Sequence, residues 1–116
     1  MMTKIVIFAF RADPQCMYHA LLNVLDLEEN GLWGEIVFEG ESTKLIPEMA
    51  QPDHMLHQLY SQAKTRGLLW GACYACSQKM GVAQQIEEEN IPLCRDMSGH
   101  PAMSHFIKQD YSILIF

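Results

Sequence analysis

Apolar runs alternate along the chain with segments in which apolar residues recur at helical spacing. The first run, residues 4–10 (KIVIFAF), is rich in β-branched and aromatic residues and has no polar alternation. Such a run is typical of a strand that is covered on both faces, as in a parallel sheet. Further strands are predicted over residues 35–39, 68–72, 91–93 and 111–116.

A helix is predicted directly after the first strand. The side chain of Asp13 can cap its amino end, and Pro14 suits its first position. Apolar residues then recur at helical spacing as far as Asn30 and Gly31, which tolerate the left-handed backbone that ends a helix. Shorter helices are predicted over residues 42–49, 53–66, 74–80 and 82–89, and from residue 101 onward.

The resulting order, βαβααβαβαβ, predicts a single α/β domain over residues 1–116. Strands that alternate with helices pair in parallel, and the connecting helices cover both faces of the sheet. The expected fold is a three-layer α/β/α domain with a five-stranded, mainly parallel sheet. A chain of 116 residues that is 49% hydrophobic suits one globular domain with its own core.

Charge and hydropathy exclude some function classes. The net charge is −6 and the eight Lys and Arg residues are scattered, which argues against direct nucleic-acid binding. No apolar segment approaches the roughly 18 residues that cross a membrane, and the first run is too short for a signal peptide. We therefore expect a cytoplasmic protein that contacts neither a membrane nor nucleic acid directly.

The four cysteines all follow predicted strands. Cys16 follows the first strand, Cys73 and Cys76 the third, and Cys94 the fourth. In a parallel sheet the carboxyl ends of the strands meet at one edge, where open α/β sheets bind ligands. The same edge is expected to carry Arg11, Asp13, Arg95, Asp96 and His100. Without a secretory signal, reduced thiols with a redox, sulfur-transfer or metal role fit better than disulfides.

Cys73 and Cys76 form a CxxC pair where the third strand gives way to a helix. Free N–H groups at a helix amino end favour a thiolate, and a lowered pKa makes the thiol a better nucleophile. Cys76, one turn further on, is close enough to resolve a mixed disulfide or to accept sulfur. We therefore predict Cys73 and Cys76 as the catalytic residues, with no cofactor and no metal ligand.

The other candidates at this edge are weighed differently. Cys16, on the first turn of an amphipathic helix, is expected to pack in the core. Cys94 fits the core and the site equally well, and His100 before Pro101 is more typical of a loop or capping residue.

Competing function classes use the same residues. A thioredoxin-like oxidoreductase would use Cys73 and Cys76 as its dithiol. Against this class, the thioredoxin motif normally follows an early βαβ pattern, whereas the CxxC pair here follows the third predicted strand. A zinc site could use Cys73, Cys76, Cys94 and His100, but a core of this size does not require a structural metal. Sulfur carriage is the third class: a thiolate accepts sulfane sulfur as a persulfide and passes it on. A non-catalytic oligomeric module that binds a small ligand is the remaining alternative.

Two segments, GACYACSQKMG and IPLCRDMSGHPAMSHFIKQDYSILIF, resemble the DsrE/DsrF-like family of small α/β sulfur-relay proteins. Those proteins show a cysteine just after the third strand and a glycine eight residues later, a spacing held here by Cys73 and Gly81. The initial KIVIFAF and the turn at Gly40–Glu41 also fit, so the resemblance covers essentially the whole chain.

The resemblance implies a single DsrE-like domain that forms a cytoplasmic homo-oligomer, often a trimer or hexamer. It implies that Cys73 receives sulfur as a persulfide, with sulfur donor and acceptor proteins as partners. Cys76 is shared by only some relatives and is expected to serve as a resolving thiol. The expected function is a sulfurtransferase-like sulfur carrier, and the sequence leaves open whether it is an enzyme.

Overall fold

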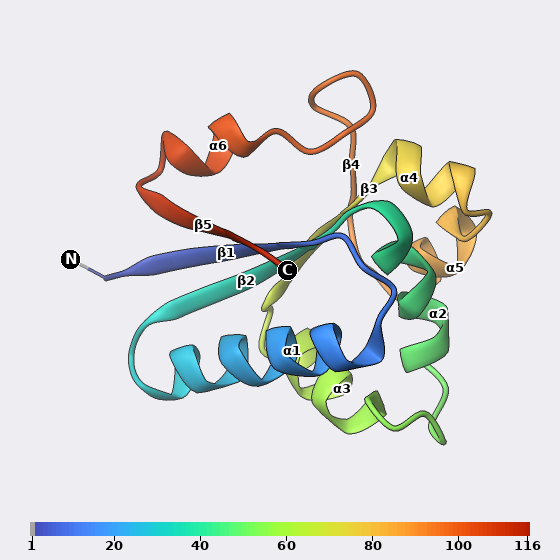
Figure 1. Ribbon diagram of the computed structural model, residues 1–116, viewed down its shortest axis with the longest axis horizontal. Coiled ribbons are helices and arrows are strands. Elements are labelled where there is room, and N and C mark those ends of the chain that lie inside the picture. Colours follow the sequence, from blue (N-terminus) through green and yellow to red (C-terminus); the bar gives the residue numbers. More distant parts are fainter. Residues whose placement is uncertain (1) are drawn as a thin grey trace.

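The computed structural model describes residues 2–116, which fold around one five-stranded sheet (Figure 1). The strands lie in the order β4-β3-β2-β1-β5, and every neighbouring pair is parallel. They are β1 (Lys4–Ala9), β2 (Trp33–Phe38), β3 (Leu69–Cys73), β4 (Leu93–Cys94) and β5 (Tyr111–Ile115). The predicted α/β fold with a parallel sheet is confirmed.

Six α-helices and one short 3₁₀ helix connect the strands within the described residues. They are α1 (Pro14–Glu29), η1 (Gly40–Lys44), α2 (Leu45–Met49), α3 (His57–Thr65), α4 (Tyr74–Lys79), α5 (Ala83–Glu88) and α6 (Met103–Ile107). The predicted cap of α1 is confirmed, because the Asp13 side chain accepts a hydrogen bond from the Gln15 N–H at 2.9 Å. None of the helices in residues 2–116 has the length and apolar character that crossing a bilayer requires.

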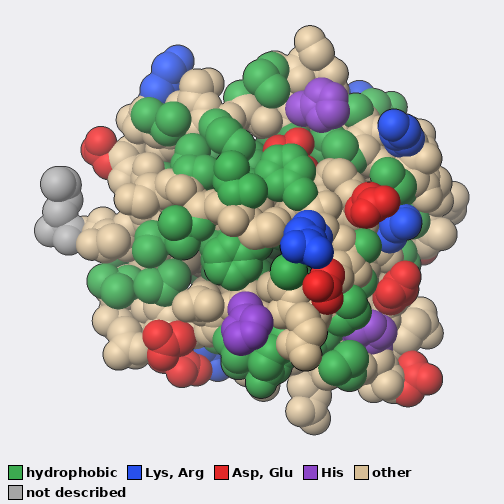
Figure 2. All heavy atoms as spheres, in the orientation of Figure 1, with side chains coloured by type: hydrophobic (Ala, Val, Ile, Leu, Met, Phe, Trp, Pro, Cys, Tyr) green, Lys and Arg blue, Asp and Glu red, His purple; other side chains and the backbone are tan. Residues whose placement is uncertain are grey.

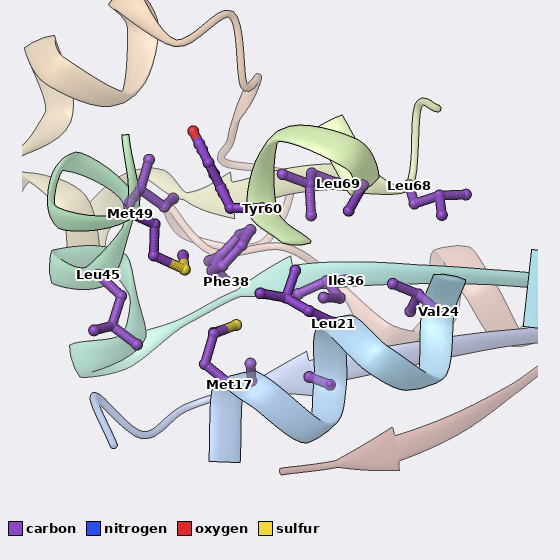
Figure 3. Packing of buried hydrophobic residues seen from close by; sticks show 14 of the residues in the cluster. Met17, Leu21, Val24, Ile36, Phe38, Leu45, Met49, Tyr60, Leu68 and Leu69 are labelled. Atoms are coloured by element: carbon purple, nitrogen blue, oxygen red, sulfur yellow. The ribbon is translucent and has the colours of Figure 1, made fainter. Parts of the chain in front are cut away.

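The main core lies on the face of the sheet that α1, α2, α3 and α5 cover. Figure 3 shows Met17 and Leu21 of α1 beside Ile36 and Phe38 of β2. Leu45, Met49, Tyr60 and Leu69 extend the same cluster. Each large apolar side chain that is fully buried here stabilises the fold by about 1.5–3 kcal/mol relative to an exposed one.

The opposite face of the sheet has a thinner cover. Val6, Phe8 and Val37 are buried there under Phe106 of α6, whose ring meets that of Phe8 edge to face at 5.6 Å. Figure 1 shows α6 on the side of β1 and β5 opposite α1 and α3. The sheet is therefore covered on both faces, as predicted, but unequally.

The strand boundaries differ from the predicted ones by one or two residues, most at β2 and β4. β2 begins at Trp33, two residues early, because Trp33 still pairs with Lys4 of β1. β4 is Leu93–Cys94 and not 91–93, because Pro92 has no N–H for the ladder; its carbonyl accepts the Ala72 N–H at 2.9 Å.

The helix boundaries differ as well, most at the helices predicted over 42–49 and from Asp53. The helix predicted over 42–49 is divided into η1 and α2, and the Ser42 hydroxyl donates to the Ala9 and Glu39 carbonyls instead of capping a helix. The helix predicted from Asp53 begins at His57, and turns fill the residues before it. Ser42 thereby ties the end of β2 to the end of β1.

The strand order decides which predicted rim residues can meet. β3 lies between β2 and β4, so the carboxyl ends of these three strands are neighbours. β1 lies on the far side of β2. Residues that follow β2, β3 and β4 are thus brought together, and those that follow β1 are held apart from β3.

Candidate functional site

Cys73 is the last residue of β3 and the N-cap of α4. Its Sγ accepts a hydrogen bond from the Cys76 N–H at 3.3 Å, and its carbonyl accepts one from the Ser77 hydroxyl at 2.6 Å. The side chain is fully buried. Because α4 has only six residues, the Cys73 sulfur interacts with one backbone N–H and not with the dipole of a long helix.

Cys76 lies one turn into α4 and is only partly buried. It lines a cavity of about 340 Å³ at the carboxyl edge of the sheet. The other lining residues are Gly40, Ala75, Lys79, Met80 and His100. A small molecule that enters this cavity meets Cys76, whereas Cys73 lies behind it.

His100 reaches the two thiols from the loop that follows β4. Its Nδ1 lies 3.0 Å from Cys73 Sγ and 3.9 Å from Cys76 Sγ. The loop is fixed to the first turn of α4, because the Ala75 N–H donates to the Gly99 carbonyl at 2.9 Å. Gly99 has φ +90, and a Cβ there would lie 3.2 Å from the Ala75 methyl group, so glycine suits this close approach.

Glu39 completes the group from the end of β2. Its Oε1 lies 3.8 Å from His100 Nδ1, and only 8% of the residue is exposed. The backbone is fixed on both sides, since the Glu39 N–H donates to the Ala9 carbonyl at 2.8 Å and the Ser42 hydroxyl donates to the Glu39 carbonyl. Burial raises the pKa of the Glu39 carboxyl, and the nearby His100 opposes this rise.

These four side chains form one compact cluster, in which the sulfur, nitrogen and oxygen atoms all lie within 4.8 Å of one another. Burial raises the pKa of the Cys73 thiol to about 12, and the neighbouring Cys76 thiol adds to the rise more than the Cys76 N–H offsets it. This is the reverse of the lowered pKa expected at a helix amino end. When it carries neither sulfane sulfur nor a metal ion, Cys73 is therefore a protonated thiol at neutral pH.

The four cysteines, which all follow strands, do not gather into one site. Cys16 lies at the start of α1, with its Sγ 3.8 Å from Asp13 Oδ2. Cys94 is a register partner of Cys73, but it is buried with its Sγ 3.8 Å from the Pro92 carbonyl. Burial raises the pKa of Cys94 to about 11. Neither thiol belongs to the cluster. In the alternative of a zinc site, Cys94 is therefore not available as a ligand beside Cys73, Cys76 and His100, and Glu39 lies there instead.

Glu39 is the residue that sequence reasoning missed. The sequence predicts it only as the last residue of the strand over 35–39, and not as a site residue. The only signal in the sequence is that Glu39 ends a strand, because the strand ends share the edge where Cys73 and His100 are expected. That β2 lies beside β3 is seen only in the structure. Of the charged residues expected at this edge, Arg95 lies with its guanidinium carbon 3.7 Å from the centre of the Tyr74 ring and does not join the cluster.

Comparisons with known proteins bear on the fold more than on the chemistry. No family model matches the chain. Two uncharacterized proteins of Archaeoglobus fulgidus are similar to parts of it. One is 38% identical over 37 residues, which are 32% of this chain and 100% of that protein. The other is 40% identical over 47 residues, which are 40% of this chain and 75% of that protein. The chain belongs to the same family as these archaeal proteins.

A solved structure has the same fold. It is that of a conserved protein of unknown function from Bacteroides thetaiotaomicron, with a TM-score of 0.71 at 19% identity over 97% of this chain and 94% of that one. At this identity the likeness shows the fold alone. The DsrE/DsrF-like resemblance stays a prediction, and function has to be argued from the site.

Proposed function

We propose that this protein is a sulfurtransferase-like carrier that holds sulfane sulfur as a persulfide on Cys73 and Cys76. The observation that carries the proposal is the 3.0 Å contact between Cys73 Sγ and His100 Nδ1. A thiol beside an imidazole nitrogen is the arrangement of an activated sulfur nucleophile, because the ring can accept the thiol proton as the sulfur attacks. The DsrE/DsrF-like resemblance, which assigns sulfur uptake to the position of Cys73, supports the same reaction.

The exposure of the two thiols suggests an order of events. Cys76 lines the cavity and Cys73 is fully buried, so Cys76 is the thiol that an incoming donor reaches first. Lys79 at the cavity wall places a positive charge near the entry, which favours an anionic persulfide donor. This order refines the expectation that Cys73 takes up the sulfur directly.

The proposed transfer has two balanced steps. In the first, the Cys76 sulfur attacks the outer sulfur of a donor persulfide, the donor S–S bond breaks, and the donor leaves as a thiol that takes up the Cys76 proton. In the second, the Cys73 sulfur attacks that outer sulfur, and its bond to Cys76 breaks. His100 Nδ1, 3.0 Å from Cys73 Sγ and 3.9 Å from Cys76 Sγ, takes the proton of one and returns it to the other. The sulfane sulfur changes place without net oxidation or reduction.

Intact-protein mass spectrometry tests this proposal. The metal-free, reduced protein is incubated with a low-molecular-weight persulfide, and the adduct of one added sulfur atom is located by peptide mapping. Cys76→Ser is expected to prevent loading, and Cys73→Ser is expected to keep the adduct on Cys76. His100→Gln should slow transfer to Cys73 by about 100-fold, in the range of general acid–base catalysis.

Cys16→Ser is the matched control, because it removes a partly buried thiol that lies outside the cluster. It should load like the wild type. If a folded Cys73→Ser/Cys76→Ser double variant gained the added sulfur at the wild-type rate, the proposal would be refuted.

We further propose that the chain forms a homo-oligomer, a trimer or hexamer, and exchanges sulfur with donor and acceptor proteins in the cytoplasm. The exposed apolar side chains near β5 and α6 support self-association: Ile107 is 61% exposed and Ile115 is 63% exposed. Figure 2 shows hydrophobic side chains gathered on this side of the molecule. Size-exclusion chromatography with light scattering measures the state, and a monomer at every concentration would contradict the proposal.

A further inference from the structure

Three groups that can carry negative charge converge on one nitrogen atom. His100 Nδ1 lies 3.0 Å from Cys73 Sγ, 3.9 Å from Cys76 Sγ and 3.8 Å from Glu39 Oε1. A ring nitrogen takes part in one hydrogen bond, so it cannot satisfy all three. Water offers little compensation at the carboxylate, since only 11% of the Glu39 side chain is exposed. A cation placed among the four atoms would satisfy every one of them.

We propose that Glu39, Cys73, Cys76 and His100 bind a divalent transition-metal ion, and that zinc is the preferred ion. The inference goes beyond sulfur carriage and does not rest on it, although the two functions use the same sulfur atoms. It also departs from the expectation of a metal-free protein.

The spacing of the four atoms fits tetrahedral zinc. Zn–S bonds of about 2.3 Å and Zn–N or Zn–O bonds of about 2.0–2.2 Å put the ligand atoms about 3.3–3.8 Å apart. The three distances to His100 Nδ1 run from 3.0 to 3.9 Å, and all four atoms lie within 4.8 Å of one another. Side-chain movements of less than about 1 Å would give a closed tetrahedral site.

The ligand types select among metals. Two thiolates and an imidazole suit zinc, whereas calcium and magnesium take oxygen ligands. A single carboxylate completes a four-ligand set, and Cys73 and Cys76 supply the C-x₂-C spacing that recurs in zinc sites. The divalent charge would stabilise the thiolate form of both cysteines, which lose their protons when the metal binds.

Hydrogen bonds fix the ligands and the segments that carry them. The Cys76 N–H donates to Cys73 Sγ, the Ser42 hydroxyl anchors the Glu39 carbonyl, and Gly99 joins the His100 loop to α4. Such surrounding contacts orient metal ligands before the metal binds. The site therefore comes from three separate parts of the chain that the fold itself holds in place.

Metal binding has a consequence for the thiols. With both sulfurs coordinated, neither is free to attack a donor, so zinc and sulfane sulfur compete for the same atoms. We expect zinc to slow persulfide loading of the wild-type protein by at least about 10-fold at saturation.

Optical titration of the full-length, reduced, metal-free protein with Co²⁺ tests the site. One equivalent should give the visible bands of tetrahedral cobalt and a thiolate-to-cobalt charge-transfer band, and Zn²⁺ should displace it. Glu39→Gln and His100→Gln should each weaken zinc binding by at least about 10- to 100-fold. Cys76→Ser should lower the charge-transfer band to about half, since one of two thiolate ligands is lost.

Matched controls use residues of the same types that lie outside the cluster. Glu41→Gln, His105→Gln and the half-buried Cys16→Ser should bind cobalt and zinc like the wild type. Circular dichroism of each variant shows whether it is folded. Failure of the wild type to bind either ion stoichiometrically would overturn the inference, as would wild-type affinity in folded Glu39→Gln and His100→Gln.

The same variants separate this inference from sulfur carriage. In each variant, persulfide loading is measured on the metal-free protein and zinc affinity on the protein without added sulfur, so each function has its own readout. Sulfur loading without metal binding would remove only the metal site. Metal binding without sulfur loading would remove only the proposed carrier function.

Discussion

Cys73 Sγ and His100 Nδ1 lie 3.0 Å apart, although 27 residues separate them in the sequence. The contact follows from the strand order, because β3 and β4 are parallel neighbours and the chain leaves both strands at the same edge of the sheet. The hydrogen bond from the Ala75 N–H to the Gly99 carbonyl then closes the gap between α4 and the loop. The thiol and the imidazole are thus placed by backbone pairing, and the chemistry of the site depends on that pairing.

The four thiols should differ in their rates of alkylation in the native state. Cys76 and Cys16 are partly exposed, whereas Cys73 and Cys94 are buried. A neutral alkylating reagent should therefore modify Cys76 and Cys16 first, and Cys73 only after a local opening of the structure. Peptide mapping by mass spectrometry at successive times measures the order. Denatured protein, in which all four should react alike, is the control; native labelling of Cys73 as fast as Cys16 would contradict the described burial.

The fold was predictable because the alternation of apolar runs and helical segments is a local signal. The strand at the start of the chain, the Asp13 cap and the parallel sheet all follow from short stretches of sequence. Short elements were predicted less well. The two-residue β4 and the division of 42–49 into η1 and α2 depend on tertiary contacts, such as those of Ser42, that periodicity does not reveal.

The site was predictable only in part, because the spatial order of strands cannot be read from their order in the chain. The rule that carboxyl ends share one edge brought Cys73, Cys76 and His100 together correctly. The same rule also included Cys16, which the intervening β2 separates from β3. Glu39 was missed for the same reason: only the placement of β2 beside β3 turns a strand-end carboxylate into a neighbour of the thiols.

Gly71→Ala should destabilise the pairing of β3 with β4. A Cβ at this position would lie 2.5 Å from Cys94 Sγ and 3.0 Å from the Pro92 carbonyl oxygen. Forcing an extra methyl group into a packed interior typically costs about 1–3 kcal/mol. Urea unfolding followed by circular dichroism measures the loss of free energy of unfolding.

Cys94→Ala provides the matched background for this test, because it removes the closer of the two contacts. Gly71→Ala should lower the free energy of unfolding less in that background than in the wild type. Some loss should remain, because the contact with the Pro92 carbonyl is still made. An equal cost in both backgrounds would show that Cys94 is not the obstacle.

Tyr111→Phe should destabilise the thinner face of the sheet. The Tyr111 hydroxyl donates to Glu35 Oε1 at 2.5 Å, and the Trp33 Nε1–H donates to the same oxygen. Glu35 is only 5% exposed, and its Oε2 has no hydrogen-bond partner within residues 2–116. Loss of a donor to this buried carboxyl should cost about 1–3 kcal/mol of unfolding free energy. Tyr18→Phe, at an exposed ring, is the control; equal small effects of the two substitutions would refute the prediction.

Glu89 should make a pH-dependent contribution to stability. Its Oε1 accepts hydrogen bonds from the Tyr60 hydroxyl at 2.6 Å and from Lys64 Nζ at 3.0 Å, which ties the end of α5 to α3. Burial favours the neutral acid, but the contacts with Tyr60 and Lys64 outweigh it and lower the pKa of the Glu89 carboxyl. The ionised form is thus favoured by folding, so the stabilisation is fully present above the unfolded pKa of about 4.3 and is lost as the pH falls through the lower folded value.

Glu89→Gln is therefore expected to lower the free energy of unfolding by about 1 kcal/mol at pH 7, because the pair is partly exposed. The difference from the wild type should shrink as the pH falls below about 4. Urea unfolding at pH 7 and at a pH below about 4 measures this change. Glu88→Gln, at an exposed carboxylate on the same helix, is the control. A difference of the same size at both pH values would mean that packing of the Glu89 side chain, and not its charge, joins the two helices.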